Sequence, residues 1–298
     1  MQQMKYLIIV IIGALATIYG KGTLFNNDAG DATEVSAGKT MSSKPVSSAK
    51  GSASKSIPSA KDNASSRQQK TFDFTPKTKA DGIRLERTAY TLLYNKEIRL
   101  PLWVAWHLTK NHTSGTNKRE GLKFVEDEDV PMPRATNMDY VNSGYDRGHM
   151  CPSGDNKWSA RAQEESFLYT NCCPQLHTLN AGDWEELESK CRYWARKFGD
   201  IYIVCGPVFL NKKHKTIGKS RVVVPEAFYK VVLCMQGTPK GIGFIYRNDL
   251  SNKKMSSYVN TIDDVERITG IDFFPALPDN IEKKVEATVN LSDWAISE

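Results

Sequence analysis

Apolar residues between positions 100 and 246 follow spacings that predict strands. In the stretch 100–108 every second position is apolar, which is typical of a strand with one buried face. Three shorter apolar runs, 201–204, 228–235 and 242–246, predict three more strands. Gly206-Pro207 is a turn signal after the first run, and residues 237–241 (GTPKG) predict the turn between the last two.

Other stretches show the spacing of helices. Between 180 and 198, apolar residues recur three and four positions apart and form one stripe, made of Trp184, Leu187, Cys191, Trp194 and Phe198. A short helix fits 158–169, and another fits 261–269 with Gly270 as its C-cap. Because strands and helices mix without a regular βαβ rhythm, we expect an α+β fold with a mainly antiparallel sheet.

The first 75 residues have a different pattern. Residues 6–19 form an uncharged, mostly apolar stretch, which fits the hydrophobic region of a signal peptide and is short for a membrane span of about 20 residues. Residues 26–71 are rich in Ser and contain no Phe, Tyr, Trp or Leu, too little apolar surface to offset the entropy of folding. We therefore expect a signal peptide or N-terminal anchor at 1–20, a disordered Ser/Lys-rich linker at 21–75 and a folded domain at 76–298.

Such an N-terminus predicts an exported protein, periplasmic or secreted, with membrane contact only if the apolar segment is retained. The composition, 40% hydrophobic and 25% charged, is that of a globular protein and excludes a disordered chain, a collagen-like fibre and a multi-pass membrane protein. Most of the net charge of +6 comes from residues 1–75. Bulk charge therefore gives no argument that the domain binds nucleic acid, and local basic patches would have to supply it.

Six cysteines lie in the domain, and export would permit disulfides. Six cysteines allow 15 complete pairings, and the sequence does not choose among them. The chain has no CxxC pair, which argues against a zinc site. Cys205 and Cys234 lie in apolar runs, where a cysteine can simply be part of the core.

The residues whose side chains are best suited to catalysis are clustered between 119 and 192. In the run 145–150 (YDRGHM), Asp146 could orient a base, Arg147 could bind phosphate and His149 could accept a proton. Residue types alone leave a structural and a functional role for His149 equally open. A second cluster contains TNCCPQ at 170–175 and LNAGDWEELE at 179–188, and the ion pair expected between Glu188 and Arg192 would be worth little by itself.

Taken together, DRGHM at 146–150, TNCCPQ at 170–175 and LNAGDWEELE at 179–188 resemble the DNA/RNA non-specific endonucleases, a family that includes secreted bacterial nucleases and mitochondrial endonuclease G. DRGH is the signature of that family. The segments LPLWVAWHLT at 100–109 and ITGIDFFPALP at 268–278 are also similar, so the resemblance covers roughly 76–285. It implies a mixed fold with a ββα-metal core.

The resemblance further implies hydrolysis of phosphodiester bonds in DNA and RNA to 5′-phosphate products, with Mg²⁺ or Mn²⁺. His149 resembles the general base, Asn180 the one side chain that binds the metal directly, and Glu188 the acid that holds metal-bound waters. The remaining matches are the arginines near the scissile phosphate and the substrate-binding positions that shape the site: Arg147, Arg192, Arg119, Asn171 and Gln175. DNA and RNA are the partners implied, with no stable protein partner.

Two alternatives come from other classes: an extracellular nucleic-acid-binding protein that does not cleave, and a phosphodiesterase acting on small nucleotides. The intact triplet of His149, Asn180 and Glu188 argues against the first. Adjacent cysteines seldom bond each other. We therefore hypothesise a disulfide between Cys173 and Cys151, and a second one between Cys205 and Cys234.

Overall fold

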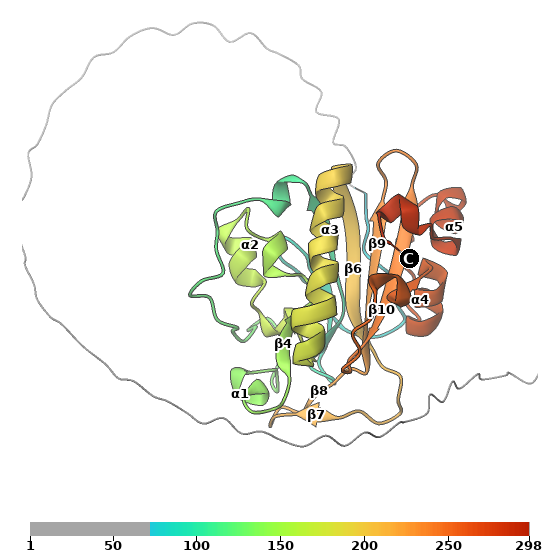
Figure 1. The fold of residues 1–298 in the computed structure, drawn as a ribbon. Helices are drawn as coiled ribbons and strands as arrows, with labels where there is room; N and C mark the ends of the chain where they lie inside the picture. The colour runs from blue at the N-terminus through green and yellow to red at the C-terminus, as the bar shows by residue number, and fades with distance from the viewer. Residues whose placement is uncertain (1–71, 298) are drawn as a thin grey trace, which may run out of the picture. The chain divides into compact units, whose positions relative to one another are not determined.

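The computed structural model describes residues 72–297. Within them, seven strands form one antiparallel sheet in the order β1-β2-β3-β6-β9-β10-β11, and two pairs form small separate sheets, β4-β5 and β7-β8 (Figure 1). The strands are β1 (Ile83–Glu86), β2 (Thr91–Asn95), β3 (Leu100–Thr109), β4 (Asp146–His149), β5 (Cys172–Gln175), β6 (Asp200–Val208), β7 (Thr216–Ile217), β8 (Val222–Val223), β9 (Ala227–Cys234), β10 (Lys240–Arg247) and β11 (Val259–Asn260).

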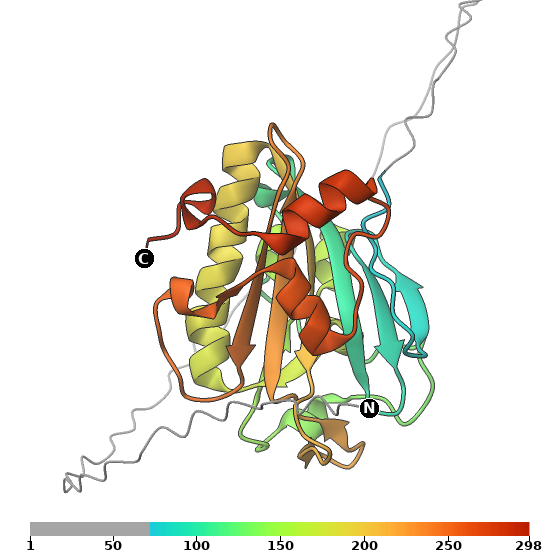
Figure 2. The ribbon, with the colours of Figure 1, turned by 90° about the vertical axis from the view of Figure 1, so that its right-hand side faces the viewer.

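Helices cover both faces of the large sheet. The α-helices are α1 (Asn137–Tyr140), α2 (Ala160–Glu165), α3 (Trp184–Phe198), α4 (Ile262–Thr269) and α5 (Asp279–Ala287). Figure 1 shows α3 along one face of the sheet, while α4 and α5 lie on the other, and Figure 2 shows α4 and α5 in front of the strands. The expected α+β class with a mainly antiparallel sheet is therefore confirmed.

Alternation along the strands divides the apolar residues into two cores. In β9, Phe228 and Val232 belong to the core that contains the buried stripe of α3. Tyr229 and Val231, which point to the opposite face, belong to the core beneath α4 and α5. Successive side chains of a strand point to opposite faces, so one apolar strand supports both helical layers. The sheet consequently separates α3 and its neighbours from the α4–α5 layer.

Several local predictions are confirmed. The strand at 100–108 is β3, the runs at 228–235 and 242–246 are β9 and β10, and the stripe at 180–198 is the buried face of α3. Thr261 caps α4 by accepting a hydrogen bond from the main-chain N–H of Asp264, and Gly270 ends it in the left-handed conformation at φ 70°. Both caps satisfy main-chain groups that a helix end leaves free.

The turn predicted at Gly206-Pro207 is wrong, because β6 continues through it to Val208. A Cβ on Gly206 would lie 2.5 Å from the Leu102 carbonyl oxygen, so glycine is needed for a close approach inside the sheet and not for a turn. Pro207 is tolerated because the pairing of β6 with β3 ends at Cys205, and beyond it only β9 is paired.

Two predicted helices have different bounds in the structure. The helix at 158–169 is only α2, and Tyr169–Asn171 forms a separate 3₁₀ turn. The helix at 180–198 begins as a π-helical turn, Leu179–Asp183, in which Gly182 has non-helical dihedral angles, and the regular helix starts at Trp184. The apolar stripe marks the buried face correctly but cannot reveal the wide turn before it, since π turns follow from local packing.

All six cysteines are free and buried, so both proposed disulfides are wrong. Cys205 on β6 is opposite Lys230 on β9, and Cys234 lies four residues further along, about 13 Å at the rise of a strand. That separation exceeds the reach of a disulfide. The Cys151 thiol accepts a hydrogen bond from the Asn156 amide instead.

The predicted signal peptide or anchor at 1–20, and the linker at 21–75 up to residue 71, lie outside the described residues. Phe72 and Phe74 pack their rings against Tyr202 of β6. The main chains of Lys77 and Asp272 pair in an isolated antiparallel β-bridge. Between residues 72 and 297, no helix has the length and apolar character that crossing a membrane would require.

Candidate active site

The DRGH residues form strand β4, which pairs with β5. Asp146 lies opposite Gln175, and His149 lies opposite Cys172. The Gln175 side chain occupies the space over Gly148, so that a Cβ on Gly148 would overlap it. Gln175 is completely buried, and neither of its amide atoms has a hydrogen-bond partner among the described residues. Glycine at 148 is thus required by packing against the neighbouring strand.

His149 is partly buried between two aromatic rings. Its ring centroid lies 4.7 Å from that of Phe124 and 5.0 Å from that of Phe167, and its Nε2 has no hydrogen-bond partner among residues 72–297. Burial, and then the positive charge of Arg119, lower the pKa of His149 to about 3. The imidazole is therefore neutral at pH 7, with nitrogen available to accept a proton.

Arg119 and α3 both connect to His149. The Arg119 guanidinium lies 5.6 Å from the ring centroid of Phe167, which packs edge-on against the imidazole. From the other side, the indole Nε1 of Trp184 donates a hydrogen bond of 3.2 Å to the His149 main-chain oxygen. The first residue of α3 is therefore tied to the end of β4, and the strand pair and helix form one unit.

Asp146 positions Asn180 and does not orient His149. Its Oδ2 accepts a 3.0 Å hydrogen bond from the Asn180 amide nitrogen and lies 2.7 Å from His177 Nδ1. The Asn180 amide nitrogen is therefore engaged by Asp146, and the Asn180 amide oxygen takes no part in this hydrogen bond. The expectation that Asp146 orients a base is corrected, because the carboxylate lies beside the π-helical turn and binds two groups there.

Glu188 and Arg192 lie on the face of α3 that borders the site. Burial raises the pKa of Glu188 to about 7, and Asp155 adds to this, whereas Lys230 and Arg192 oppose it. Arg192 donates a 3.1 Å hydrogen bond to Asp155, which is buried, and another to Ser189. The expected ion pair between Glu188 and Arg192 is thus replaced by one between Arg192 and Asp155 from a distant loop.

Lys230 is a residue of this region that sequence reasoning missed. It is completely buried, and its Nζ lies 4.3 Å from the ring centroid of Trp184, with no hydrogen-bond partner within the described part of the chain. Burial alone lowers its pKa, but acidic groups that include Cys205 and Glu188 outweigh this and raise it. The available signal was a lysine in the middle of the apolar run FYKVVLCM at 228–235.

Arg147 lies two residues before His149 on β4, so alternation places both side chains on the same face of the strand. Its guanidinium donates to the side chains of Tyr169 and Asn137, at 3.1 and 2.7 Å, and lies 5.4 Å from the ring centroid of Tyr140. Asn171 is completely buried, and its amide bonds the main chain of Cys151 and Ser166. These bonds hold the loop after His149 and leave no part of the amide exposed to a substrate.

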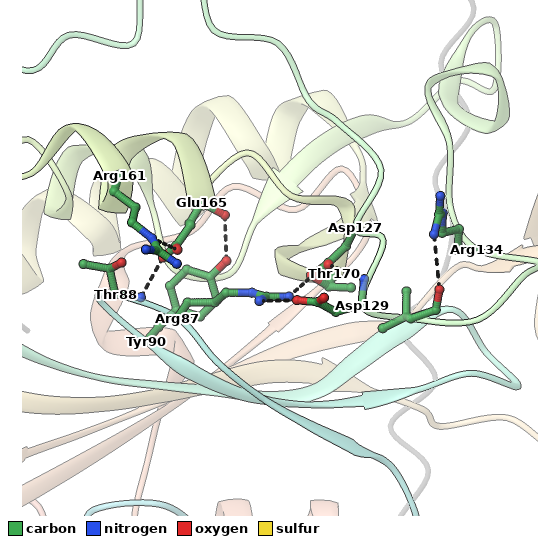
Figure 3. Close-up of polar contacts among 10 residues, drawn as sticks. Arg87, Thr88, Tyr90, Asp127, Asp129, Arg134, Arg161, Glu165 and Thr170 are labelled. Carbon is green, nitrogen blue, oxygen red and sulfur yellow. Dashed lines mark hydrogen bonds and ion pairs between the residues drawn. The ribbon is translucent and has the colours of Figure 1, made fainter.

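A polar network fixes the loop that carries Phe124. Figure 3 shows Arg87 beside Asp127 and Asp129, to which it makes ion pairs of 2.6 and 2.7 Å, and Thr170 donating to Asp127. In the same view Glu165 accepts bonds from the Thr88 main chain and from the Arg161 side chain. The network ties the β1–β2 hairpin to the chain before and after β4, and so supports the aromatic walls of His149.

The donor set suits a hard divalent cation. An amide oxygen of Asn180 and a carboxylate of Glu188 are oxygen ligands, and so small a set suits Mg²⁺, which keeps several waters when bound to proteins. The expected base, metal ligand, acid and arginines come from four segments: β4 with His149 and Arg147, the π-helical turn with Asn180, α3 with Glu188 and Arg192, and the loop after β3 with Arg119.

Comparisons with known proteins agree with this arrangement. The profile of the family described as DNA/RNA non-specific endonuclease matches residues 67–280. The chain is 37% identical over 204 residues to mitochondrial nuclease EXOG of Xenopus laevis, covering 63% of this chain and 57% of that protein. It is 32% identical to mitochondrial endonuclease G of Bos taurus, covering 63% and 68%. The chain thus spans less than two thirds of the length of the first relative.

A solved structure is also similar. It is the crystal structure of the EndoG/EndoGI complex, which concerns inhibition of EndoG, and it matches with a TM-score of 0.63 and 28% identity over 65% of this chain and 86% of that chain. The expectation of an exported, periplasmic or secreted protein is contradicted by these comparisons, since EXOG, endonuclease G and a yeast nuclease among the matching relatives are named as mitochondrial.

Proposed function

Because this chain belongs to the DNA/RNA non-specific endonuclease family, we propose that it is a metal-dependent endonuclease that hydrolyses phosphodiester bonds in DNA and RNA and leaves 5′-phosphate ends. The observation that carries the proposal is the neutral His149, whose Nε2 has no partner among the described residues, beside Arg119 and on the strand that holds Asn180 through Asp146.

His149 acts as the general base. A phosphodiester is anionic and repels hydroxide, so the attacking water must lose its proton locally as it reaches phosphorus. A neutral imidazole accepts that proton at a ring nitrogen, and the aromatic rings of Phe124 and Phe167 keep it oriented. The hydrogen bond from Trp184 to the His149 carbonyl oxygen fixes the main chain relative to α3.

Asn180 would hold the metal directly through its amide oxygen, and Glu188 would hold it through bound water. Mg²⁺ or Mn²⁺ supplies positive charge that stabilises the departing oxygen. Asp146 keeps the Asn180 nitrogen turned away from the cation by accepting its hydrogen bond. Lys230 and Arg192 favour the ionised form of Glu188, against the effect of its burial.

Arg119 and Arg192 provide fixed positive charge for the phosphate as negative charge builds up on it. Arg147 lies on the same face of β4 as His149 and is held there by bonds to Tyr169 and Asn137. Contacts to phosphate and sugar carry no sequence information, so a site of this kind cuts without regard to base and accepts both DNA and RNA.

The test is cleavage of circular plasmid and of RNA by the full chain, with Mg²⁺ or with EDTA. His149→Ala should reduce the rate by about 10²–10⁴-fold, the usual contribution of a general base. His214→Ala is the matched control, because His214 is a partly buried histidine bonded to Glu226 outside the site. Nicking of a circle requires no ends and so excludes a pure exonuclease.

Two outcomes would contradict the proposal. A folded protein that binds nucleic acid but leaves plasmid and RNA intact in Mg²⁺ and in Mn²⁺ is a non-cleaving binder. Cleavage of dinucleotides but not of polymers indicates a small-nucleotide phosphodiesterase.

A further inference from the structure

Three acidic side chains from two helices converge on the face of the sheet opposite α3. Asp263 and Glu266 belong to α4, and Glu286 belongs to the last turn of α5. Each offers a carboxylate oxygen, and these oxygens all lie within 4.8 Å of one another. We propose that Asp263, Glu266 and Glu286 form a binding site for a divalent cation, Ca²⁺ in preference to Mg²⁺, that clamps α4 to α5. The proposal does not depend on the catalytic function.

Glu286 is the strongest sign of a missing ligand. Only 7% of its surface is exposed, and its Oε1 has no hydrogen-bond partner among the described residues. A carboxylate buried without a partner costs several kcal/mol, and proteins normally pair such a group or use it to bind a metal. Glu266 uses one oxygen to accept a 2.7 Å bond from the Phe273 N–H, which leaves its second oxygen for a cation.

Among the described residues, no positive charge is a leading influence on Glu286. The charged groups that act most strongly on Glu286 are Glu266, Glu282, Asp263 and Asp272, and all of them are acidic. Burial, and then these neighbours, raise the pKa of Glu286 to about 8, and similar causes raise that of Glu266 to about 7. Lys77 and Lys283 act on Glu282, at the edge of the cluster. A divalent cation would balance the cluster directly.

The donor chemistry selects the ion. The cluster contains only carboxylates, with no histidine or cysteine, so zinc and softer metals are disfavoured. Ca²⁺ takes six to eight oxygen ligands in flexible geometry and accepts bidentate carboxylates, whereas Mg²⁺ demands a strict octahedron and gives up its waters reluctantly. Three carboxylates with two more nearby resemble a calcium site more than the catalytic site, where one amide oxygen faces the metal.

The cation would join two helices whose apolar side chains already belong to one core. Val265 of α4 and Val285 of α5 belong to one core with Tyr229 and Phe273. The carboxylates next to these valines repel one another across the same helix pair. Binding Ca²⁺ therefore stabilises the folded chain by mass action, because the unfolded chain does not assemble the site.

The experiment measures the melting temperature and Ca²⁺ binding of the full chain in the Asn180→Ala background, which removes the proposed catalytic metal ligand. After EDTA treatment, Ca²⁺ should raise the melting temperature by several degrees, Mg²⁺ should raise it less, and calorimetry should count one Ca²⁺. Glu286→Gln and Asp263→Asn should abolish this gain. Glu97→Gln, an exposed carboxylate in the turn between β2 and β3, should keep it.

Glu286→Gln has a second expected effect: without metal and at a pH above about 8, where the Glu286 carboxylate is ionised, it should melt above its parent, since it removes an unpaired buried charge. An equal Ca²⁺ gain in Glu286→Gln and its parent would overturn the proposal. So would the absence of any Ca²⁺ gain, in which case a proton shared by Glu266 and Glu286 accounts for the cluster. The readouts of this experiment are stability and Ca²⁺ binding. A failed cleavage assay would therefore change neither the support for the Ca²⁺ site nor the evidence against it.

Discussion

Single buried charges decide how the residues around His149 are arranged. Lys230 is the clearest case, because its Nζ lies against the Trp184 ring, and the indole of that ring bonds the His149 carbonyl. A lysine buried without a hydrogen-bond partner is costly, and replacement by an apolar residue of similar volume is often neutral or stabilising. Its presence in the centre of β9 therefore indicates a role in the charge balance of Glu188.

Lys230→Met tests that role. The loss of a nearby cation raises the pKa of Glu188 beyond its already high value of about 7, so less of the carboxylate is ionised at neutral pH. A rise of about one pKa unit lowers the ionised fraction at pH 7 from about one half to about one tenth, so we expect nicking activity to fall by about 5-fold, with the melting temperature unchanged or higher. Plasmid nicking rates and thermal melts of the same samples measure both quantities.

Lys240→Met is the matched control for this change. Lys240 is on the neighbouring strand β10, and its Nζ also lies over an aromatic ring, 3.8 Å from the Phe198 centroid. It should retain full activity. Equal activity of Lys230→Met and wild type, or equal losses of activity and stability in the two variants, would show that Lys230 has no specific effect on Glu188.

At the scale of elements, the site depends on two short strands being pressed against the start of α3. β4 and β5 have four residues each, and an isolated strand pair of this size is not stable in water. Their position is set by neighbours: Asn171 bonds the chain after β4, and Trp184 bonds its last residue. The close fit of Gly148 under Gln175 completes this packing.

Gly148→Ala should disrupt the strand pair. The new methyl group overlaps the Gln175 side chain, and overpacking of this kind costs about 1–3 kcal/mol, so we expect both a lower melting temperature and a large loss of nicking. The double variant Gly148→Ala with Gln175→Ala should recover much of the stability, because the truncated side chain makes room. Thermal melts of the two single variants and the double variant complete the cycle, and strictly additive losses would refute this account.

For the whole molecule, the core on the α3 side of the sheet encloses all the thiols. All six cysteines belong to it, and burial raises the pKa of Cys151, Cys172, Cys173, Cys191 and Cys205. Cys234 is buried at the end of β9, and burial also raises its pKa. A thiolate is the reactive form, so buried thiols with raised pKa values are inert. The fold therefore needs no disulfide for its stability.

Thiol counting tests this conclusion on the full chain. In native protein an aromatic disulfide reagent should find no fast-reacting thiol, and in denaturant it should find all six. Dithiothreitol should leave the melting temperature unchanged. A count of four in denaturant, restored to six by reductant, would demonstrate a disulfide.

The sequence predicted those features that depend on neighbouring residues in the chain. Apolar periodicity located β3, β9, β10, α3 and α4, and the residues around them carried the family resemblance. It did not predict β4 and β5, whose four-residue spans have no periodicity of their own, nor α5. It also misjudged Gly206-Pro207, because the need for glycine there arises from Leu102 on another strand.

The sequence by itself determined the fold class, the family and the residues proposed for catalysis, since local spacing and short motifs can be recognised without knowledge of the fold. Only the tertiary structure decided which groups meet: Asp146 with Asn180, Arg192 with Asp155, Lys230 near Glu188, and Glu286 with Glu266. Those pairs join segments as many as 42 residues apart, and burial sets their charge states. Neither the pairing of these distant groups nor their charge states can be read from the spacing of residues along the chain.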